Sequence, residues 1–304
     1  MDEKLQTELQ EQFNAATESF IGKVRIDPNV IAVIICGSLA YDVVWEKSDI
    51  DMTLIVRDQH LSNESYCIVE DGITINVSVV ARSSFKRYIE SQLGGSFIQS
   101  YYSRGKIVYT TDDSLYEYFE EIRKPGCDDI ELSIFNIACE LVHLYDKCRK
   151  WMTVKKDLHY TQYYLLKAAE SIARIEVFMS GESPGREVIL RALEINPDVI
   201  KPFYTNAMSH PMNKEEILQA MASIERYLEE HLDIFKKPAL TFLSDQQLKT
   251  VTLITRHFHT EGHFIIGIFD YLAEKGVIEK VSQTIRITPK SKLAVEEIGY
   301  LYIP

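Results

Sequence analysis

The chain has 304 residues, of which 46% are hydrophobic and 26% charged, and its formal net charge is −12. This length suffices for two or three domains, and the composition is that of an ordinary globular protein. The acidic balance argues against a nucleic-acid-binding protein, because attraction to phosphate requires basic surface, although a local basic patch can override it.

The sequence contains no pattern typical of secretion or membrane insertion. Residues 1–13 are charged and lack the apolar stretch of a signal peptide, and no run approaches roughly 18 uninterrupted apolar residues. The five cysteines are an odd number without metal-like pairing, as expected for free thiols in a reducing compartment. We therefore expect a cytoplasmic protein with no membrane partner.

The amino-terminal third combines helix-like and strand-like patterns. Apolar residues at helical spacing predict a helix over 3–24, which Pro28 brings to an end. Asp71-Gly72 is typical of a two-residue hairpin turn. Strands are predicted over 30–36, 50–56, either side of that turn within 67–80, and 106–110, and helices over 83–93 and 112–124.

Pro125-Gly126 marks the first predicted domain boundary, because residues 128–235 are almost entirely helical in pattern and predict a bundle. A second boundary is expected near KKPAL, residues 236–240. The predicted domains are a mixed α/β core over 1–125, a helical bundle over 126–238 and a small module over 239–304.

The last domain has its own predicted order of elements. Two helices are expected over 245–259 and 262–275, then a hairpin formed by GVIEKV and TIRITP, then a closing helix over 290–298. This order resembles a winged-helix module. Residues 240–304 carry seven Lys/Arg and seven Asp/Glu, and the second helix is apolar, so packing, dimerisation or a lid is favoured over DNA binding.

A Gly-Ser pair and two aspartates stand between the first two predicted strands. Gly37 permits close approach of the backbone, and the Ser38 hydroxyl with nearby amides can hold a phosphate. Side chains alternate along a strand, so Asp49, Asp51 and Thr53 are expected on one face. Two like charges this close persist if one is protonated or if a cation lies between them, and Mg²⁺ prefers such oxygen ligands.

This arrangement resembles the signature of the DNA polymerase β-like nucleotidyltransferase superfamily, and GSLAYDVVWEKSDID matches its small, minimal members in spacing. The helical segment after the core is similar in architecture to the antibiotic nucleotidyltransferases. The resemblance implies an α+β fold with a mixed nucleotidyltransferase-like sheet. It also implies Asp49 and Asp51 as catalytic metal ligands for Mg²⁺, and Gly37 and Ser38 as the nucleotide-binding turn.

The sequence departs from this superfamily where a third carboxylate is expected. Asn76 stands there and offers a neutral carbonyl oxygen, so a second cation is expected to bind more weakly. Tyr41-Asp42 replaces the Arg-Gly pair common in the small members. Glu140 in the bundle is a candidate for the missing base, although a surface or ion-paired role is the simpler interpretation.

Two further groups have weaker indications of a site. His257, His259 and His263 could bind Zn²⁺ by spacing, but they cross a helix junction with no cysteine nearby, so a metal role is not favoured. Lys47 and Arg57 flank the aspartates and either contact phosphates or remain solvated.

Aromatic and acidic residues share one helix of the bundle. Tyr160, Tyr163 and Tyr164 are interpreted as core aromatics, with stacking on a substrate ring as the alternative. Glu170 and Glu176 either face solvent or attract a cationic acceptor.

Three functions remain open from the sequence. The first is an enzyme that transfers a nucleoside monophosphate from a Mg²⁺-bound nucleoside triphosphate to a hydroxyl of a small molecule. The second is a degenerate relative that binds nucleotide without turnover and signals through the winged-helix-like module. The third is a transferase acting on RNA or protein, which the acidic balance disfavours for tRNA. The oligomeric state is left open.

Overall fold

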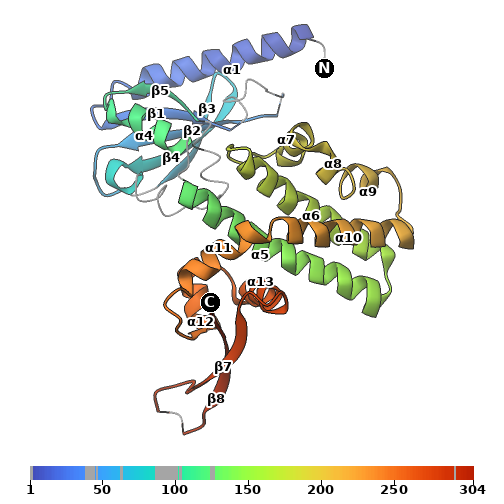
Figure 1. Cartoon of the computed structure of the whole chain (residues 1–304). Coiled ribbons are helices and arrows are strands. Elements are labelled where there is room, and N and C mark those ends of the chain that lie inside the picture. The colour runs from blue at the N-terminus through green and yellow to red at the C-terminus, as the bar shows by residue number, and fades with distance from the viewer. Residues whose placement is uncertain are drawn as a thin grey trace. The chain divides into compact units, whose positions relative to one another are not determined.

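The computed structural model describes residues 3–37, 45, 47–61, 64–85, 102, 105–123, 127–290 and 292–304. The chain divides into two compact units, Met1–Gly126 and Cys127–Pro304 (Figure 1). The first unit contains a mixed sheet flanked by helices, and the second is mainly helical, which confirms the predicted α+β class. The further division of the second unit near residue 238 stays a prediction.

A five-stranded sheet forms the centre of the first unit. Its order is β3-β4-β2-β1-β5, with β2 and β4 parallel and the other neighbours antiparallel. The predicted strands are confirmed, with bounds β1 Val30–Cys36, β2 Ile50–Val56, β3 Ser65–Glu70, β4 Ile73–Ala81 and β5 Lys106–Thr110. The hairpin turn is also confirmed, because Asp71 and Gly72 both have positive φ angles, 51° and 83°.

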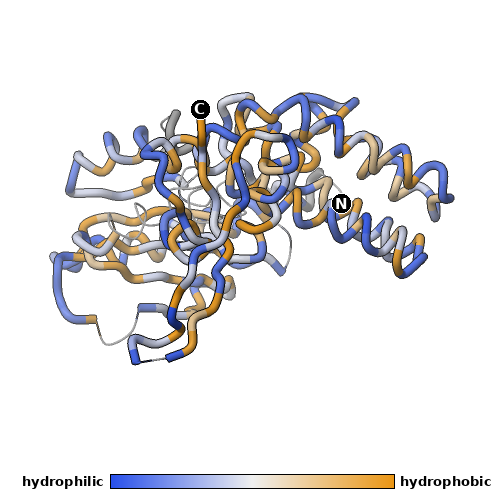
Figure 2. The backbone as a smooth tube through the Cα atoms, turned by 60° about the horizontal axis from the view of Figure 1, so that its bottom comes forward, coloured by the Kyte–Doolittle hydropathy of each residue, from blue (hydrophilic) through white to orange (hydrophobic). Residues whose placement is uncertain are grey.

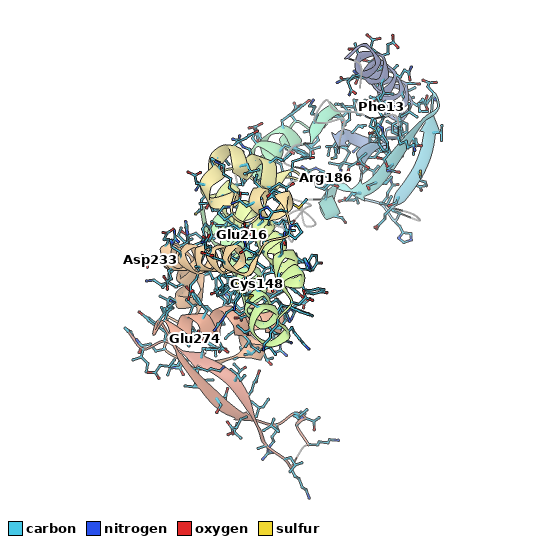
Figure 3. All side chains as sticks on the ribbon, turned by 90° about the vertical axis from the view of Figure 1, so that its right-hand side faces the viewer. Phe13, Cys148, Arg186, Glu216, Asp233 and Glu274 are labelled. Atoms are coloured by element: carbon cyan, nitrogen blue, oxygen red, sulfur yellow. The ribbon has the colours of Figure 1, made fainter. Side chains whose placement is uncertain are left out.

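Both faces of this sheet are covered by helices, and this burial explains the apolar runs of the central strands. On one face α1 (Glu3–Val24) packs Phe13 and Phe20 against residues such as Met52 (Figure 3). On the other face α4 (Ser114–Arg123) packs Leu115 and Phe119 against alternate strand residues. The predicted helix over 83–93 lies largely outside the described residues, of which Arg82–Phe85 are helical.

The buried carboxylate of Glu70 connects α1 to the β3–β4 hairpin. Glu70 ends β3 and accepts hydrogen bonds from the Ser19 hydroxyl at 2.5 Å and from the Lys23 amine at 2.6 and 2.8 Å. These bonds, with the Lys23 bond as the largest influence, lower the pKa of Glu70 below its ordinary value. The helix is therefore held by charge as well as by apolar burial.

The second unit is a bundle followed by a small sheet. Its helices are α5 Cys127–Lys150, α6 Leu158–Met179, α7 Val188–Ile195, α8 Pro197–Ile200, α9 Thr205–Ser209, α10 Lys214–Glu230, α11 Leu232–Phe242, α12 Val251–Phe258 and α13 Gly262–Glu274. Hydrophilic and hydrophobic residues alternate along these helices (Figure 2). One apolar cluster extends from the bundle into the carboxyl-terminal segment, from Ile134 to Tyr300.

The carboxyl-terminal segment corrects several sequence predictions. The strands are β6 Lys249–Thr250, β7 Glu279–Ile285 and β8 Val295–Leu301, in the order β6-β8-β7. The predicted closing helix over 290–298 is wrong, as is the second hairpin strand over TIRITP. Pairing of β8 with both neighbours, and burial of Tyr300 against Phe269, outweigh the local helix preference.

Helix α11 also differs from the sequence prediction, because it continues through Pro238 rather than ending near KKPAL. Proline removes one helical hydrogen bond. The fully buried side chains of Phe235 and Ala239 on either side of it compensate by packing in the core. The segment 245–248, predicted as the start of a helix, lies before β6, and α12 begins only at Val251.

No helix among the described residues is both long and apolar enough to cross a membrane.

We expect Glu70→Gln to reduce stability at neutral pH and to flatten its dependence on acid pH. A carboxylate whose pKa is lowered by folding contributes stability above its unfolded pKa, near 4.5, and loses it as the pH falls through the folded value. Thermal unfolding between about pH 3 and 7 measures this. Glu11→Gln, on the exposed side of the same helix, is the matched control, and equal effects of both changes would contradict the role of Glu70.

Candidate functional site

The predicted site lies where β1 ends and β2 begins. Gly37 directly follows β1 and has a φ of 68°, a left-handed conformation that favours glycine. A Cβ atom on Gly37 would overlap the carboxylate of Asp51, so the absence of a side chain there makes room for that carboxylate. Ser38, the other predicted phosphate ligand, and Tyr41-Asp42 lie outside the described residues.

Strand register brings the predicted polar residues together. Asp51 pairs with Cys36 on β1 and with Asn76 on β4, so three neighbouring strands meet at one level of the sheet. Asp49 lies two residues before Asp51 on the same side of the chain, as the alternation of side chains predicted. The structure therefore juxtaposes Gly37, Asp49, Asp51 and Asn76.

The Asn76 amide connects the two carboxylates. Its Nδ2 donates a short hydrogen bond to Asp49 Oδ2 and a longer one, at 3.4 Å, to Asp51 Oδ1. These contacts confirm that both aspartates point to the same side of the sheet. Donation by one amide nitrogen to both carboxylates reduces their mutual repulsion, which is the role that a bound cation also fulfils.

These side chains fit a divalent cation. Two carboxylates converge on one point, Asp49 is exposed, and Asp51 is half-buried against Gly37. Asn76 also carries a carbonyl oxygen, and rotation of its amide exchanges that oxygen with Nδ2. Carboxylate and amide oxygens are ligands that Mg²⁺ accepts, so the donor set suits one hard cation better than two.

The other predicted site residues have partners elsewhere. Glu140 lies on α5 in the second unit and pairs with Arg174 at 3.1 Å, so its role as a base stays a prediction. Arg57 donates from Nε to the Pro28 carbonyl at 3.0 Å. Lys47 Nζ lies 5.7 Å from the centre of the Trp45 ring.

A hollow of about 490 Å³ lies in the same unit, and the sequence did not predict it. Ser78, two residues beyond Asn76 on β4, contributes to its lining. Tyr102 also lines it and shares a hydrogen bond of 3.1 Å with Thr53 on β2. Tyr102 belongs to a segment with no clear period, so no local sequence signal identified it.

Among the residues with weaker indications of a site, His257 and Glu176 make structural contacts. Among the described residues no cluster of three or more His, Cys, Asp or Glu side chains could hold a metal ion, and the His257 ring stacks on Phe242 at 4.0 Å between centroids. Glu176 is buried, and it accepts hydrogen bonds from Tyr227 at 2.8 Å and Asn196 at 2.9 Å. The prediction of a solvated charge is therefore wrong for Glu176, and attraction of a cationic acceptor stays a prediction.

The prediction that Tyr160 and Tyr163 pack in the core is also wrong, because these residues are 44% and 45% exposed.

The fold is similar to that of a nucleotidyltransferase-like protein from Exiguobacterium sibiricum, with a TM-score of 0.66 and 17% sequence identity over 96% of this chain and 100% of that one. This likeness establishes a nucleotidyltransferase-like fold. A spectinomycin adenyltransferase from Enterococcus faecialis, solved with ATP and spectinomycin, matches with a TM-score of 0.34 and 13% identity over 71% of this chain and 98% of that one. This TM-score is too low to indicate a shared fold. No protein-family profile and no curated protein sequence matches the chain.

We expect Gly37→Ala to destabilise the fold by about 1–2 kcal/mol, from the strain of a left-handed alanine, and also to weaken Mn²⁺ binding by displacing Asp51. Gly72→Ala is the matched control, because Gly72 also has positive φ but its added Cβ meets nothing within 4 Å. Urea unfolding and calorimetric Mn²⁺ titration measure the two effects. Equal Mn²⁺ affinities of the two variants would show that Gly37 does not position the carboxylate.

We expect Asn76→Asp to strengthen Mn²⁺ binding by at least about tenfold, since a third charge near a divalent cation adds more than the ~1.4 kcal/mol that tenfold represents. Without metal the same variant should melt lower than the wild type, because three carboxylates then repel each other. Asn29→Asp, which also places a new charge beside an aspartate, controls for net charge. Unchanged affinity would mean that Asn76 does not face the cation.

Proposed function

We propose that the protein is a nucleotidyltransferase that moves a nucleoside monophosphate from a Mg²⁺-bound nucleoside triphosphate to a hydroxyl group of a small molecule. The observation that carries the proposal is the convergence of Asp49, Asp51 and Asn76 beside the Gly37 turn. The nucleotidyltransferase-like fold supports it.

Each residue has a defined part in the proposal. Asp49 and Asp51 would hold Mg²⁺, which when bound neutralises phosphate charge and orients the triphosphate. Gly37 keeps the backbone close to Asp51, and Ser38 is the proposed hydroxyl ligand for a phosphate oxygen. The half-buried position of Asp51 keeps its carboxylate fixed against β1 while the more exposed Asp49 remains accessible.

The reaction forms a bond between the acceptor oxygen and the α-phosphorus, and it breaks the bond from that phosphorus to the bridging oxygen of pyrophosphate. The acceptor hydroxyl loses its proton in this step, and Asn76 cannot take it because an amide is not a base at neutral pH. Asp49 and Asp51 are the described carboxylates beside Asn76 that could take the proton, and Glu140 stays the proposed alternative base. A weak base predicts slow turnover.

A second candidate function rests on the same asparagine. With a neutral residue in the third position, the protein could bind nucleotide and not turn it over. We propose that the carboxyl-terminal segment is a winged-helix-like module that would then transmit the bound state, which the order α11-β6-α12-α13-β7-β8 supports. In α13 the side chains of Ile265, Ile268 and Phe269 are fully buried, which favours packing over DNA contact.

Loss of both aspartates is the decisive test. We expect Asp49→Asn with Asp51→Asn to abolish transfer of labelled nucleoside monophosphate to a panel of hydroxylated acceptors and to weaken MgNTP binding at least about tenfold, since both charged ligands are lost. Asp71→Asn with Asp113→Asn makes the same charge change at exposed positions of the same unit and should leave both unchanged. Label transfer that survives the first pair would reject the assigned site. Nucleotide binding without transfer by the wild type would favour the second candidate.

A further inference from the structure

One segment of the second unit has a charge opposite to that of the chain as a whole. Residues 147–167 contain six Lys or Arg and a single Asp, so the segment is +5 while the chain is −12, which leaves −17 on the remainder. The same segment contains four aromatic residues. Its basic and aromatic members are Lys147, Arg149, Lys150, Trp151, Lys155, Lys156, Tyr160, Tyr163, Tyr164 and Lys167.

The fold presents the basic residues at the junction of two helices. Helix α5 ends at Lys150, a π-helical turn follows over Trp151–Lys155, and Lys156 takes a left-handed conformation with φ of 54° before α6 begins. Cys148 marks this end of α5 (Figure 3). Lys150, Lys155 and Lys156 are exposed, and no ion pair among the described residues involves them.

The one acidic residue of the segment, Asp157, has a structural role. Asp157 caps α6, and its side chain accepts a hydrogen bond from the Tyr160 backbone amide at 2.9 Å. Its negative charge therefore compensates the helix amino terminus and does not pair with a lysine of the described junction. Arg149 forms an ion pair with Asp146 at 3.7 Å. Lys150, Lys155 and Lys156 therefore carry most of the available positive charge.

The aromatic residues form a surface cluster on α6 and the π-helical turn. The Trp151 and Tyr160 ring centroids are 4.1 Å apart, and Tyr160 lies 5.6 Å from Tyr163 and 5.8 Å from Tyr164. Thr161 and Leu165 are fully buried and Tyr164 packs partly against the core, so Tyr160 and Tyr163 are the exposed tyrosines of the cluster. Rings that are held in place by one another and still about half exposed offer faces on which other rings can stack.

The charged side chain of Lys167 extends the aromatic cluster along α6. Lys167 Nζ lies 5.0 Å from the centre of the Tyr163 ring, and a hydrogen bond to the Tyr163 side chain raises the pKa of Lys167. Lys167 therefore remains protonated at neutral pH. Its position beside the rings disfavours a cationic ligand there and favours an anionic one.

We propose that these ten residues, the basic-aromatic patch, bind a single-stranded nucleic acid, with lysines at phosphates and with Tyr160 and Tyr163 stacked on unpaired bases. This function goes beyond the proposed nucleotidyl transfer and does not depend on it. A duplex is a poorer partner, because its bases are stacked on each other and offer no free face. An anionic membrane is also a poorer partner, since Val154 is the only aliphatic side chain described as largely exposed between residues 147 and 167.

The acidic remainder of the chain makes this surface selective. Phosphates are repelled by a net charge of −17 elsewhere and attracted where the +5 segment lies. Binding is therefore expected to be confined to the patch and to depend strongly on salt.

Fluorescence anisotropy of the full chain with a labelled oligouridine of about 12 nucleotides tests the proposal, because known sites span about 4–16 nucleotides. We expect Tyr160→Ala and Tyr163→Ala each to weaken binding by roughly 5- to 150-fold, and Tyr160→Phe to retain it, since the ring face remains. Lys155→Gln with Lys156→Gln should reduce the slope of log Kd against log salt by about 1.4, from about 0.7 for each phosphate contact.

Lys290→Gln with Lys292→Gln is the matched charge control, because it removes two exposed lysines from the β7–β8 connection of the same unit. Equal losses from the two lysine pairs would overturn the assignment to the patch. Tighter binding of duplex RNA would overturn the choice of a single strand, and binding only to phosphatidylserine vesicles would overturn the nucleic-acid proposal in favour of a membrane surface. Comparison of oligouridine with oligodeoxythymidine distinguishes RNA from DNA as the strand that is bound. Unchanged RNA binding by Asp49→Asn with Asp51→Asn is expected, and its loss would overturn the independence of the two sites.

Discussion

The repulsion between two neighbouring carboxylates is the constraint around which the first unit is arranged. Like charges repel more strongly where water is partly excluded, and Asp51 is half-buried while Asp49 is exposed. The fold reduces this repulsion with the Asn76 amide, which donates to Asp49 and Asp51 at once. The same pair of carboxylates is the basis of the cation site that we propose.

The rest of the first unit keeps that pair at the surface and fixed in position. Helices α1 and α4 cover the two faces of the sheet and bury its strands. The carboxylates extend from the strand ends, where no apolar residue is required. Gly37 lets the chain turn away from β1 without displacing Asp51. Rigid strands on each side then hold the polar groups more accurately than a loop could.

The two units separate two kinds of chemistry by charge. In our two proposals the acidic site binds a cation and, through it, a triphosphate, whereas the basic-aromatic patch binds the phosphates and bases of a polymer directly. A left-handed backbone conformation lies next to each of them, at Gly37 beside the carboxylates and at Lys156 before α6.

Local pattern by itself determined the strands β1 to β5, the turn at Asp71-Gly72 and the shared side of Asp49 and Asp51, because each follows from alternation or from a residue with special backbone freedom. Only the tertiary structure decided that Asn76 bridges the carboxylates, since strand order, not sequence distance, brings β4 beside β2. Likewise β8 became a strand because two neighbours pair with it. Contacts between distant segments carry energies that no local pattern records.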